Sequence, residues 1–108
     1  AALTVCMAIN YGGRAEITDA LKHLIGSGLS GTAIDEAAIS GVLYTAGIPD
    51  PDLIIRPGGE VRLSNYLLWQ AAYAELYFNQ VLWPDFGEED IDRALQSYAA
   101  RQRRFGGL

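Results

Sequence analysis

Along the first part of the chain, apolar residues form a short continuous run and then recur at helical spacing. The run "LTVCMAI" at 3–9 is short, apolar and bounded by "NYGG", which predicts a buried strand that ends in a glycine loop. From Arg14 to about Ile25 apolar residues recur at helical spacing, which predicts a helix that "GSGLSG" ends. Its apolar stripe comprises Ile17, Leu21, Leu24 and Ile25. The chain is therefore expected to begin as strand, glycine loop and helix.

The same alternation continues through the rest of the chain. A second helix is predicted at 35–44, because Gly47, Pro49 and Pro51 stop it and force an extended segment. Further elements are predicted as a strand at 52–56, a helix at 65–74, a short strand at 76–78 and a last helix from 88 to about 104. The last helix starts with acidic residues and ends with arginines, as the helix dipole favours. Alternating strands and helices indicate the α/β class, with a mostly parallel sheet flanked by helices.

Composition narrows the class of protein. The chain has 108 residues, of which half are apolar and 19% charged, so it is expected to fold as one globular domain. Its net charge of -5 argues against a non-specific nucleic-acid binder, and nucleic acid is not expected as a partner. Cys6 is the single cysteine, and its apolar surroundings predict a small buried side chain. No apolar run approaches the ~20 residues of a membrane span, so we expect a cytoplasmic, or at most membrane-peripheral, location.

The segment that follows the 52–56 strand carries the candidate chemistry. Ligands of open α/β sheets bind beyond the carboxyl ends of the strands, where Arg56 lies. Arg56 and Arg62 offer planar forks of donors for phosphate oxygens, around a glycine pair that allows close approach of the backbone. Ser64 or Asn65 is expected at the start of the next helix, where backbone N–H groups attract anions. These features predict a phosphate or diphosphate cradle. The alternative interpretation is that Arg62 pairs with Glu60 or a surface acid and that Ser64 only caps the helix.

Three segments, in order, resemble motifs of one enzyme family. The stretch "DLIIRPGGEVRLSNYLLWQAAYAELYFNQVLWPDF" at 52–86 resembles the C-terminal signature of the cis-prenyltransferases, the family of undecaprenyl diphosphate synthase. "INYGGRAEI" at 9–17 resembles its mid-chain loop, and "RQRRFGG" at 101–107 its C-terminal Arg-x-Gly element. The resemblance identifies 1–108 as the C-terminal portion of a single cis-prenyltransferase domain. The start at Ala1, directly before an apolar run, also suggests a piece of a longer protein.

The resemblance implies roles for particular residues. Arg56, Arg62 and Ser64 match the residues that hold the diphosphate of isopentenyl diphosphate in such enzymes. Glu60 matches a catalytic-loop glutamate that supports the arginines. Glu75 matches a catalytic carboxylate tied to the Mg²⁺ and diphosphate site, and its carboxylate is a hard oxygen ligand suited to that metal. The alternative for Glu75, without the resemblance, is a surface acid at a helix end.

Two further residues match the Arg-x-Gly element. The resemblance implies that Arg104 and Gly106 reach across a homodimer interface to the isopentenyl diphosphate of the partner subunit. The alternative for this run is a solvated basic helix end. Pro57 departs from the family, which usually has threonine or serine there. The family's N-terminal Asp-Gly-Asn-Gly-Arg-type loop, which carries the allylic site, is absent from these residues, so the segment alone is expected to be inactive.

The implied activity is condensation of isopentenyl diphosphate with an allylic diphosphate to make a Z-polyprenyl diphosphate, with possible peripheral membrane association through the lipid product. A non-catalytic subunit of the same fold, which dimerises with a catalytic partner, is the alternative, and a generic phosphosugar or nucleotide-binding domain is a third. His23 is expected to be a partly exposed helix residue. Asn10, Tyr11 and Arg14 would border the site. Aromatic residues expected to form core and dimer interface are Trp69, Tyr73, Tyr77, Phe78 and Trp83.

Overall fold

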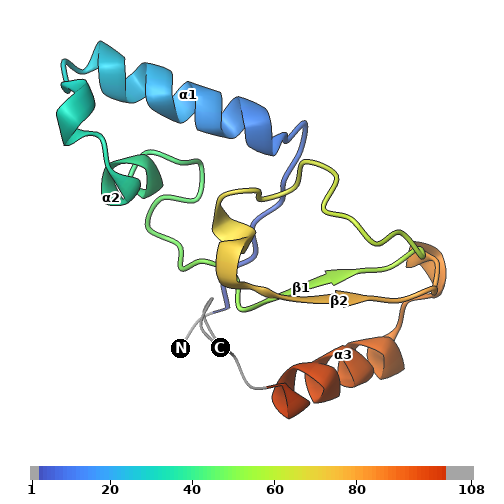
Figure 1. Ribbon diagram of the computed structural model, residues 1–108. Coiled ribbons are helices and arrows are strands. Elements are labelled where there is room, and N and C mark those ends of the chain that lie inside the picture. Colours follow the sequence, from blue (N-terminus) through green and yellow to red (C-terminus); the bar gives the residue numbers. More distant parts are fainter. Residues whose placement is uncertain (1–2, 102–108) are drawn as a thin grey trace. The chain divides into compact units, whose positions relative to one another are not determined.

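The computed structural model describes residues 3–101 of the chain, and Figure 1 shows its elements in sequence order. The helices are α1 (Gly13–Gly26), α2 (Glu36–Ser40) and α3 (Glu88–Ala100), and the strands are β1 (Leu53–Arg56) and β2 (Glu75–Phe78). Short 3-10 turns cover Gly31–Ala33, Gln70–Tyr73 and Trp83–Asp85. These elements form two compact units, each described by itself: one contains 3–48 with 65–68, and the other contains 49–64 with 69–101.

The first unit is built on α1, which packs against α2. The predicted helix at 14–25 is confirmed, and its buried face is formed by Gly13, Glu16, Ala20 and Leu24. Of the predicted apolar stripe, Leu24 is buried, but Leu21 and Ile25 are exposed. The inner face instead includes Glu16, whose carboxylate accepts hydrogen bonds from Tyr11 and Tyr44.

The predicted second helix is shorter than expected. Asp35 caps α2 by accepting a hydrogen bond at Oδ1 from the Ala38 N–H at 2.8 Å. The helix ends at Ser40 rather than Tyr44, and a series of turns follows. Leu43 lies in these turns and is buried, although it is beyond the end of the helix.

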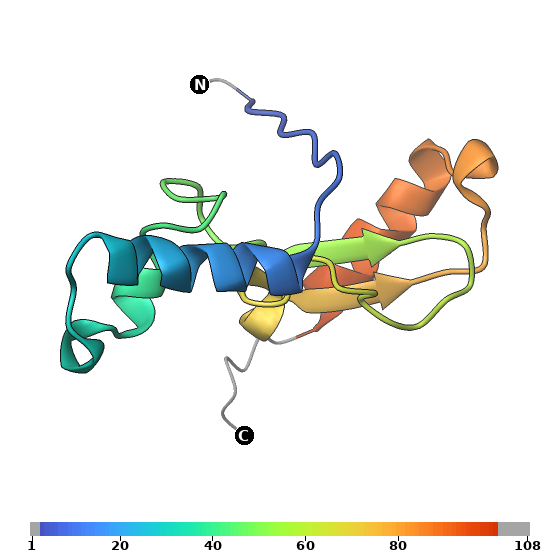
Figure 2. The same ribbon diagram turned by 90° about the horizontal axis from the view of Figure 1, so that it is seen from above.

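The second unit contains a parallel pair of strands. β1 pairs with β2 in the register Leu53 with Glu75 through Arg56 with Phe78. Figure 2 shows the two arrows side by side and pointing in the same direction. Both strands are half-buried along their whole length, with α3 packed against β2. The predicted α/β class, with a parallel sheet and helices, is confirmed.

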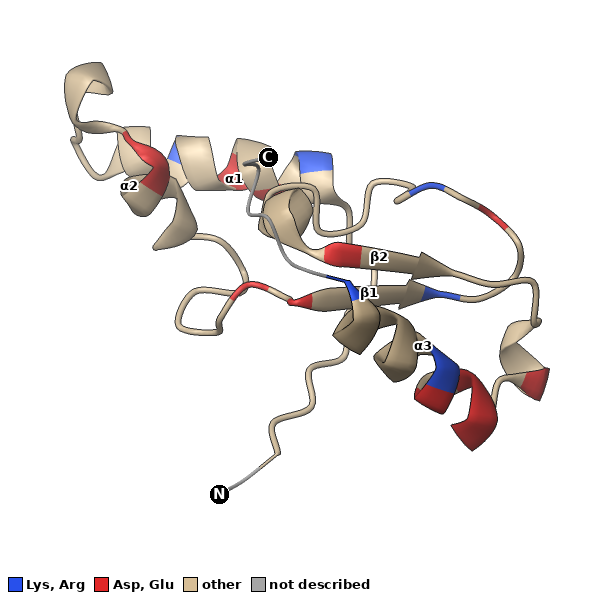
Figure 3. Ribbon diagram, turned by 60° about the horizontal axis from the view of Figure 1, so that its bottom comes forward, with Lys and Arg blue, Asp and Glu red and all other residues tan. Residues whose placement is uncertain are grey.

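The first turn of helix α3 is acidic, as its sequence predicted. Glu88, Glu89 and Asp90 lie there, and Figure 3 shows the acidic cluster at this end of the helix. The Gly87 N–H donates to Asp90 Oδ2 at 2.9 Å, so a carboxylate at the third position closes the helix start. The helix ends at Ala100, with Arg101 in extended conformation, and the rest of the predicted helix, 102–104, lies outside the described residues.

The predicted strand at 3–9 is wrong for this structure. The segment forms no strand, and its residues, including Cys6, are exposed. A strand needs a neighbour to receive its backbone hydrogen bonds, and none of the residues in 3–101 pairs with it. The prediction of a buried Cys6 fails for the same reason.

The predicted helix at 65–74 is also wrong. Only the 3-10 turn Gln70–Tyr73 forms there. Backbone φ angles of 50° at Ser64, 67° at Asn65 and 48° at Leu67 lie in the left-handed region, which a right-handed helix cannot contain. Among the described helices, none is long and apolar enough to cross a membrane.

Candidate anion-binding site

The loop that leaves β1 is shaped by two glycines. Gly58 (φ 94°) and Gly59 (φ 84°) both have left-handed backbone, which glycine adopts without steric cost. Their N–H groups donate to Val81 O and Asn79 O, both at 2.8 Å, so the loop is tied to the segment after β2. The glycine N–H groups are thus engaged within the protein, and donors for a ligand must come from side chains.

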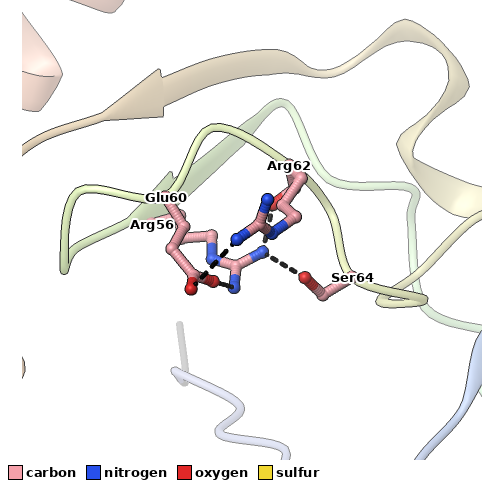
Figure 4. Close-up of polar contacts among 4 residues, drawn as sticks. All are labelled: Arg56, Glu60, Arg62 and Ser64. Carbon is pink, nitrogen blue, oxygen red and sulfur yellow. Dashed lines mark hydrogen bonds and ion pairs between the residues drawn. The ribbon is translucent and has the colours of Figure 1, made fainter.

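Four side chains converge in this loop (Figure 4). Arg56 Nη2 forms an ion pair with Glu60 Oε2 at 2.6 Å, and Arg62 Nη2 lies 3.2 Å from Glu60 Oε1. Arg56 Nη1 donates to Ser64 Oγ at 2.9 Å and to the Arg62 carbonyl oxygen. One carboxylate therefore holds two guanidinium groups, and two positive charges against one negative leave the cluster with a net charge of +1.

The two arginines differ in how many of their N–H donors are available to a ligand. Both terminal nitrogens of Arg56 are engaged inside the loop, and its side chain is 27% exposed. Arg62 is 65% exposed, and its guanidinium makes one ion pair, to Glu60, among the described residues. The Ser64 hydroxyl accepts from Arg56, which leaves its own proton to be donated. The cluster can therefore present donors from Arg62 and Ser64 to an anion, with Arg56 fixing their positions.

The structure brings together the four residues predicted in this loop, with one correction. Ser64 does not cap a helix, because no helix begins at Ser64 or Asn65. The ion pair between Arg62 and Glu60 was expected in the alternative interpretation. It is compatible with that interpretation and with a phosphate cradle. Pro57 supplies no hydroxyl, and the Ser64 hydroxyl accepts a hydrogen bond from Arg56.

Glu75 lies apart from this loop in the sequence, at the first position of β2. Its Oε2 is 3.3 Å from Arg101 Nη1, which also donates to the Leu76 carbonyl oxygen at 2.9 Å. Arg101 was not singled out from the sequence, although it is the first residue of the C-terminal "RQRR" run. Across residues 3–101, no three His, Cys, Asp or Glu side chains gather as metal ligands.

Other predicted residues have mixed outcomes. Arg104 and Gly106 lie outside the described residues. His23 is exposed, as expected. Trp69, Tyr77 and Phe78 are partly buried, whereas Tyr73 and Trp83 are exposed and are not core residues of this structure.

A second polar cluster, in the first unit, was missed from the sequence. Glu16 is only 1% exposed; Tyr11 donates to its Oε1, and the Tyr44 N–H donates to its Oε2 at 2.8 Å. Burial raises the pKa of the Tyr11 hydroxyl above its usual range, and the Glu16 carboxylate raises it further by hydrogen bonding and by charge. Glu16 was not recognised because a glutamate at a helix start normally faces solvent.

Fold and site together define a class: an α/β protein that carries an arginine-rich cluster of net positive charge at the carboxyl end of a parallel strand. A family model described as "Putative undecaprenyl diphosphate synthase" matches residues 1–106. The chain belongs to this family, which confirms the resemblance carried by its three motifs.

Individual relatives agree with this assignment. The chain is 57% identical to an isoprenyl transferase of Rickettsia bellii, over 96% of this chain and 45% of the relative. It is 53% identical to an isoprenyl transferase of Thermotoga maritima, over 98% of this chain and 46% of the relative. The chain thus spans less than half the length of these relatives.

Solved structures share the fold. Lavandulyl diphosphate synthase from Lavandula x intermedia, solved in complex with dimethylallyl diphosphate, matches with a TM-score of 0.84 and 44% identity, over 91% of this chain and 44% of that chain. A probable undecaprenyl diphosphate synthase from Campylobacter jejuni matches with a TM-score of 0.75 and 37% identity, over 91% of this chain and 45% of that one.

Proposed function

We propose that this chain supplies the isopentenyl diphosphate site of a cis-prenyltransferase, which condenses isopentenyl diphosphate with an allylic diphosphate to make a Z-polyprenyl diphosphate. The observation that carries the proposal is the cluster of Arg56, Glu60, Arg62 and Ser64 beyond β1, in a member of this family. Its net positive charge and its convergent donors suit a diphosphate, which carries several negative charges at neutral pH.

In this proposal each residue of the cluster has a separate task. Arg62, the more exposed arginine, donates to the diphosphate oxygens together with the Ser64 hydroxyl. Arg56 holds Ser64 and the Arg62 carbonyl in place, and Glu60 keeps both guanidinium groups oriented. Fixing the diphosphate positions the double bond of isopentenyl diphosphate for attack on the allylic carbon, which lowers the entropic part of the barrier. The new carbon–carbon bond forms as the allylic diphosphate leaves, and a proton is then lost.

Among residues 3–101, Glu75 is the only one that we propose as a ligand of Mg²⁺. A carboxylate suits Mg²⁺, but Glu75 is a single candidate ligand and is paired with Arg101 in this structure. Residues 3–101 therefore fit one ligand of such an ion and not a complete site. When bound, the ion would offset diphosphate charge.

The remaining parts of the activity lie outside the described residues. We place the allylic diphosphate site in the part of the relatives' length that these 108 residues do not span, so the segment by itself is proposed to be inactive. Arg104 and Gly106 are proposed to complete the site of a partner subunit in a homodimer, with peripheral membrane association only through the lipid product. A non-catalytic subunit would not need the complete cluster at 56–64, and this observation favours the enzyme.

The proposal is tested by steady-state kinetics of the intact protein that carries this chain. Arg62→Ala should lower kcat/KM for isopentenyl diphosphate about a hundredfold, since a charged hydrogen-bond pair is worth up to ~3 kcal/mol. Arg93→Ala is a matched control, because within residues 3–101 this arginine pairs only with Glu89 and Asp90 on its own helix. Unchanged kinetics in Arg62→Ala would refute the assignment of the site.

A further inference from the structure

The turn that follows β1 takes its hydrogen-bond acceptors from the segment just after β2. The N–H groups of Gly58 and Gly59 donate to the carbonyl oxygens of Val81 and Asn79, both at 2.8 Å. In the opposite direction, the Asn79 N–H donates to the Arg56 carbonyl oxygen at 3.2 Å. Figure 2 shows that the chain leaves both strands at the same end of the sheet. Three backbone hydrogen bonds therefore connect the glycine turn to the segment 79–81.

The shape of segment 79–81 is fixed by one of its own side chains. Asn79 Oδ1 accepts a hydrogen bond from the Val81 N–H at 3.1 Å, and the contact is partly buried. This bond closes an Asx turn, in which a side-chain oxygen takes the place of a backbone acceptor. Because Asn79 and Val81 each supply an acceptor to one glycine, the bond also sets the distance between those two acceptors.

The glycine turn depends on contacts from outside itself. Gly58 and Gly59 have no side chains, and a glycine backbone visits many conformations about equally well, so its own sequence does not favour a single one. Their N–H groups are fixed by segment 79–81, and the side chain of Gln80 also lies on the turn. A Cβ at Gly59 would be 2.8 Å from Gln80 Oε1, which shows how closely the two segments approach.

The turn in turn sets the geometry of the charged cluster. Arg56 directly precedes it and Glu60 directly follows it, and their ion pair of 2.6 Å spans the turn. The other oxygen of Glu60 lies 3.2 Å from Arg62 Nη2. A change in the turn would therefore move Glu60 relative to both arginines. All of these contacts lie within the second unit.

We propose that Asn79 is a positioning residue of the isopentenyl diphosphate site. Its side chain fixes segment 79–81, this segment fixes the glycine turn, and the turn keeps Glu60 where it orients Arg62. Asn79 acts through these contacts and does not itself touch substrate. The inference rests on the proposed function, because the cluster matters here only as the diphosphate cradle.

Steady-state kinetics of the intact protein test the inference through a series of side chains at position 79. Asn79→Ala should raise KM for isopentenyl diphosphate about tenfold, the scale of one lost hydrogen bond, and leave KM for the allylic substrate within about twofold of wild type. Asn79→Ser keeps a weaker acceptor for the Val81 N–H and should raise KM for isopentenyl diphosphate only about threefold. If the alanine variant does not fold, the serine variant must show this selective rise.

A double-mutant cycle tests whether the effect passes through the cluster. In an Arg62→Ala background, Asn79→Ala should raise KM for isopentenyl diphosphate by less than about twofold further, because the side chain that the turn positions is already gone. A general loss of stability would instead act alike in both backgrounds. An undiminished effect in the Arg62→Ala background would overturn the inference.

Asp35→Ala is the matched control. It also removes a side-chain oxygen that accepts from a backbone N–H, that of Ala38 at 2.8 Å, on a helix that carries no residue of the cluster. It should leave both KM values within about twofold of wild type, since a lost cap lowers stability and not substrate binding. An equal rise of both KM values in Asn79→Ala would also overturn the inference. If Arg62→Ala itself leaves KM and kcat for isopentenyl diphosphate unchanged, the proposed function fails instead.

Discussion

At the scale of single residues, Arg56 and Arg62 have different surroundings although both belong to one cluster. The terminal nitrogens of Arg56 donate to Glu60, Ser64 and the Arg62 carbonyl oxygen. The side chain of Arg62 is largely exposed. From the sequence, both guanidinium groups were predicted to bind a phosphate. The sequence could not show that one of them is used mainly inside the loop, because that depends on the left-handed turn at 58–59.

The buried pair of Tyr11 and Glu16 gives a prediction at the same scale. Tyr11→Phe removes a donor to a buried carboxylate and should lower the free energy of unfolding by about 1–3 kcal/mol near neutral pH. The raised pKa of Tyr11 means that the folded state holds the proton more tightly than the unfolded state does. The stabilisation by the hydroxyl is therefore fully present below pH ~10 and lost as the pH rises through the folded-state pKa.

Urea unfolding of wild type and variant at about pH 8 and pH 10.5 checks this prediction. The difference in unfolding free energy should shrink at the higher pH. Tyr73→Phe is the control, because its ring is exposed and the substitution should change little at either pH. A difference that stays the same, or grows, above pH 10 would contradict the linkage.

At the scale of elements, predictions succeeded where the sequence pattern and the local contacts agree. Helix α1 was predicted from the helical spacing of its apolar residues and the glycines that end it. The predicted strands β1 and β2 form because each finds its hydrogen-bond partner in the other. The run 3–9 has the pattern of a strand but no ladder neighbour among residues 3–101. At 65–74 a helix was predicted, but Asn65 has left-handed backbone and accepts hydrogen bonds from Gly13 and Arg14. Such tertiary contacts are not readable from local spacing.

The glycine turn after β1 can be tested as an element. Gly59→Ala places a Cβ on backbone with φ of 84° and should cost about 1–2 kcal/mol of stability, because left-handed backbone is unfavourable for alanine. Since this turn orients Arg56 and Arg62, the variant should also weaken binding of isopentenyl diphosphate. Gly26→Ala is the control, since Gly26 ends α1 with ordinary backbone and open space around it. Equal melting temperatures of the two variants would contradict the role of the turn.

At the scale of the whole molecule, the proposed exchange of Arg104 between subunits can be tested by mixing. Arg62→Ala and Arg104→Ala should each be nearly inactive as homodimers. If Arg104 completes the partner's site, a hybrid dimer has one site with both arginines intact, and random reassortment should recover about a quarter of wild-type activity. Gln102→Ala serves as the control substitution in the same run and should retain activity by itself. No recovery in verified hybrid dimers would show that Arg104 does not act across the interface.

The central claim is that the cluster at 56–64 binds the diphosphate of isopentenyl diphosphate. It is tested most directly by isothermal titration of isopentenyl diphosphate into the intact protein, with wild type, Arg62→Ala and Arg93→Ala compared at one salt concentration. We expect Arg62→Ala to weaken Kd by at least about tenfold, the factor for ~1.4 kcal/mol, and Arg93→Ala to match wild type. Wild-type affinity in folded Arg62→Ala would contradict the account.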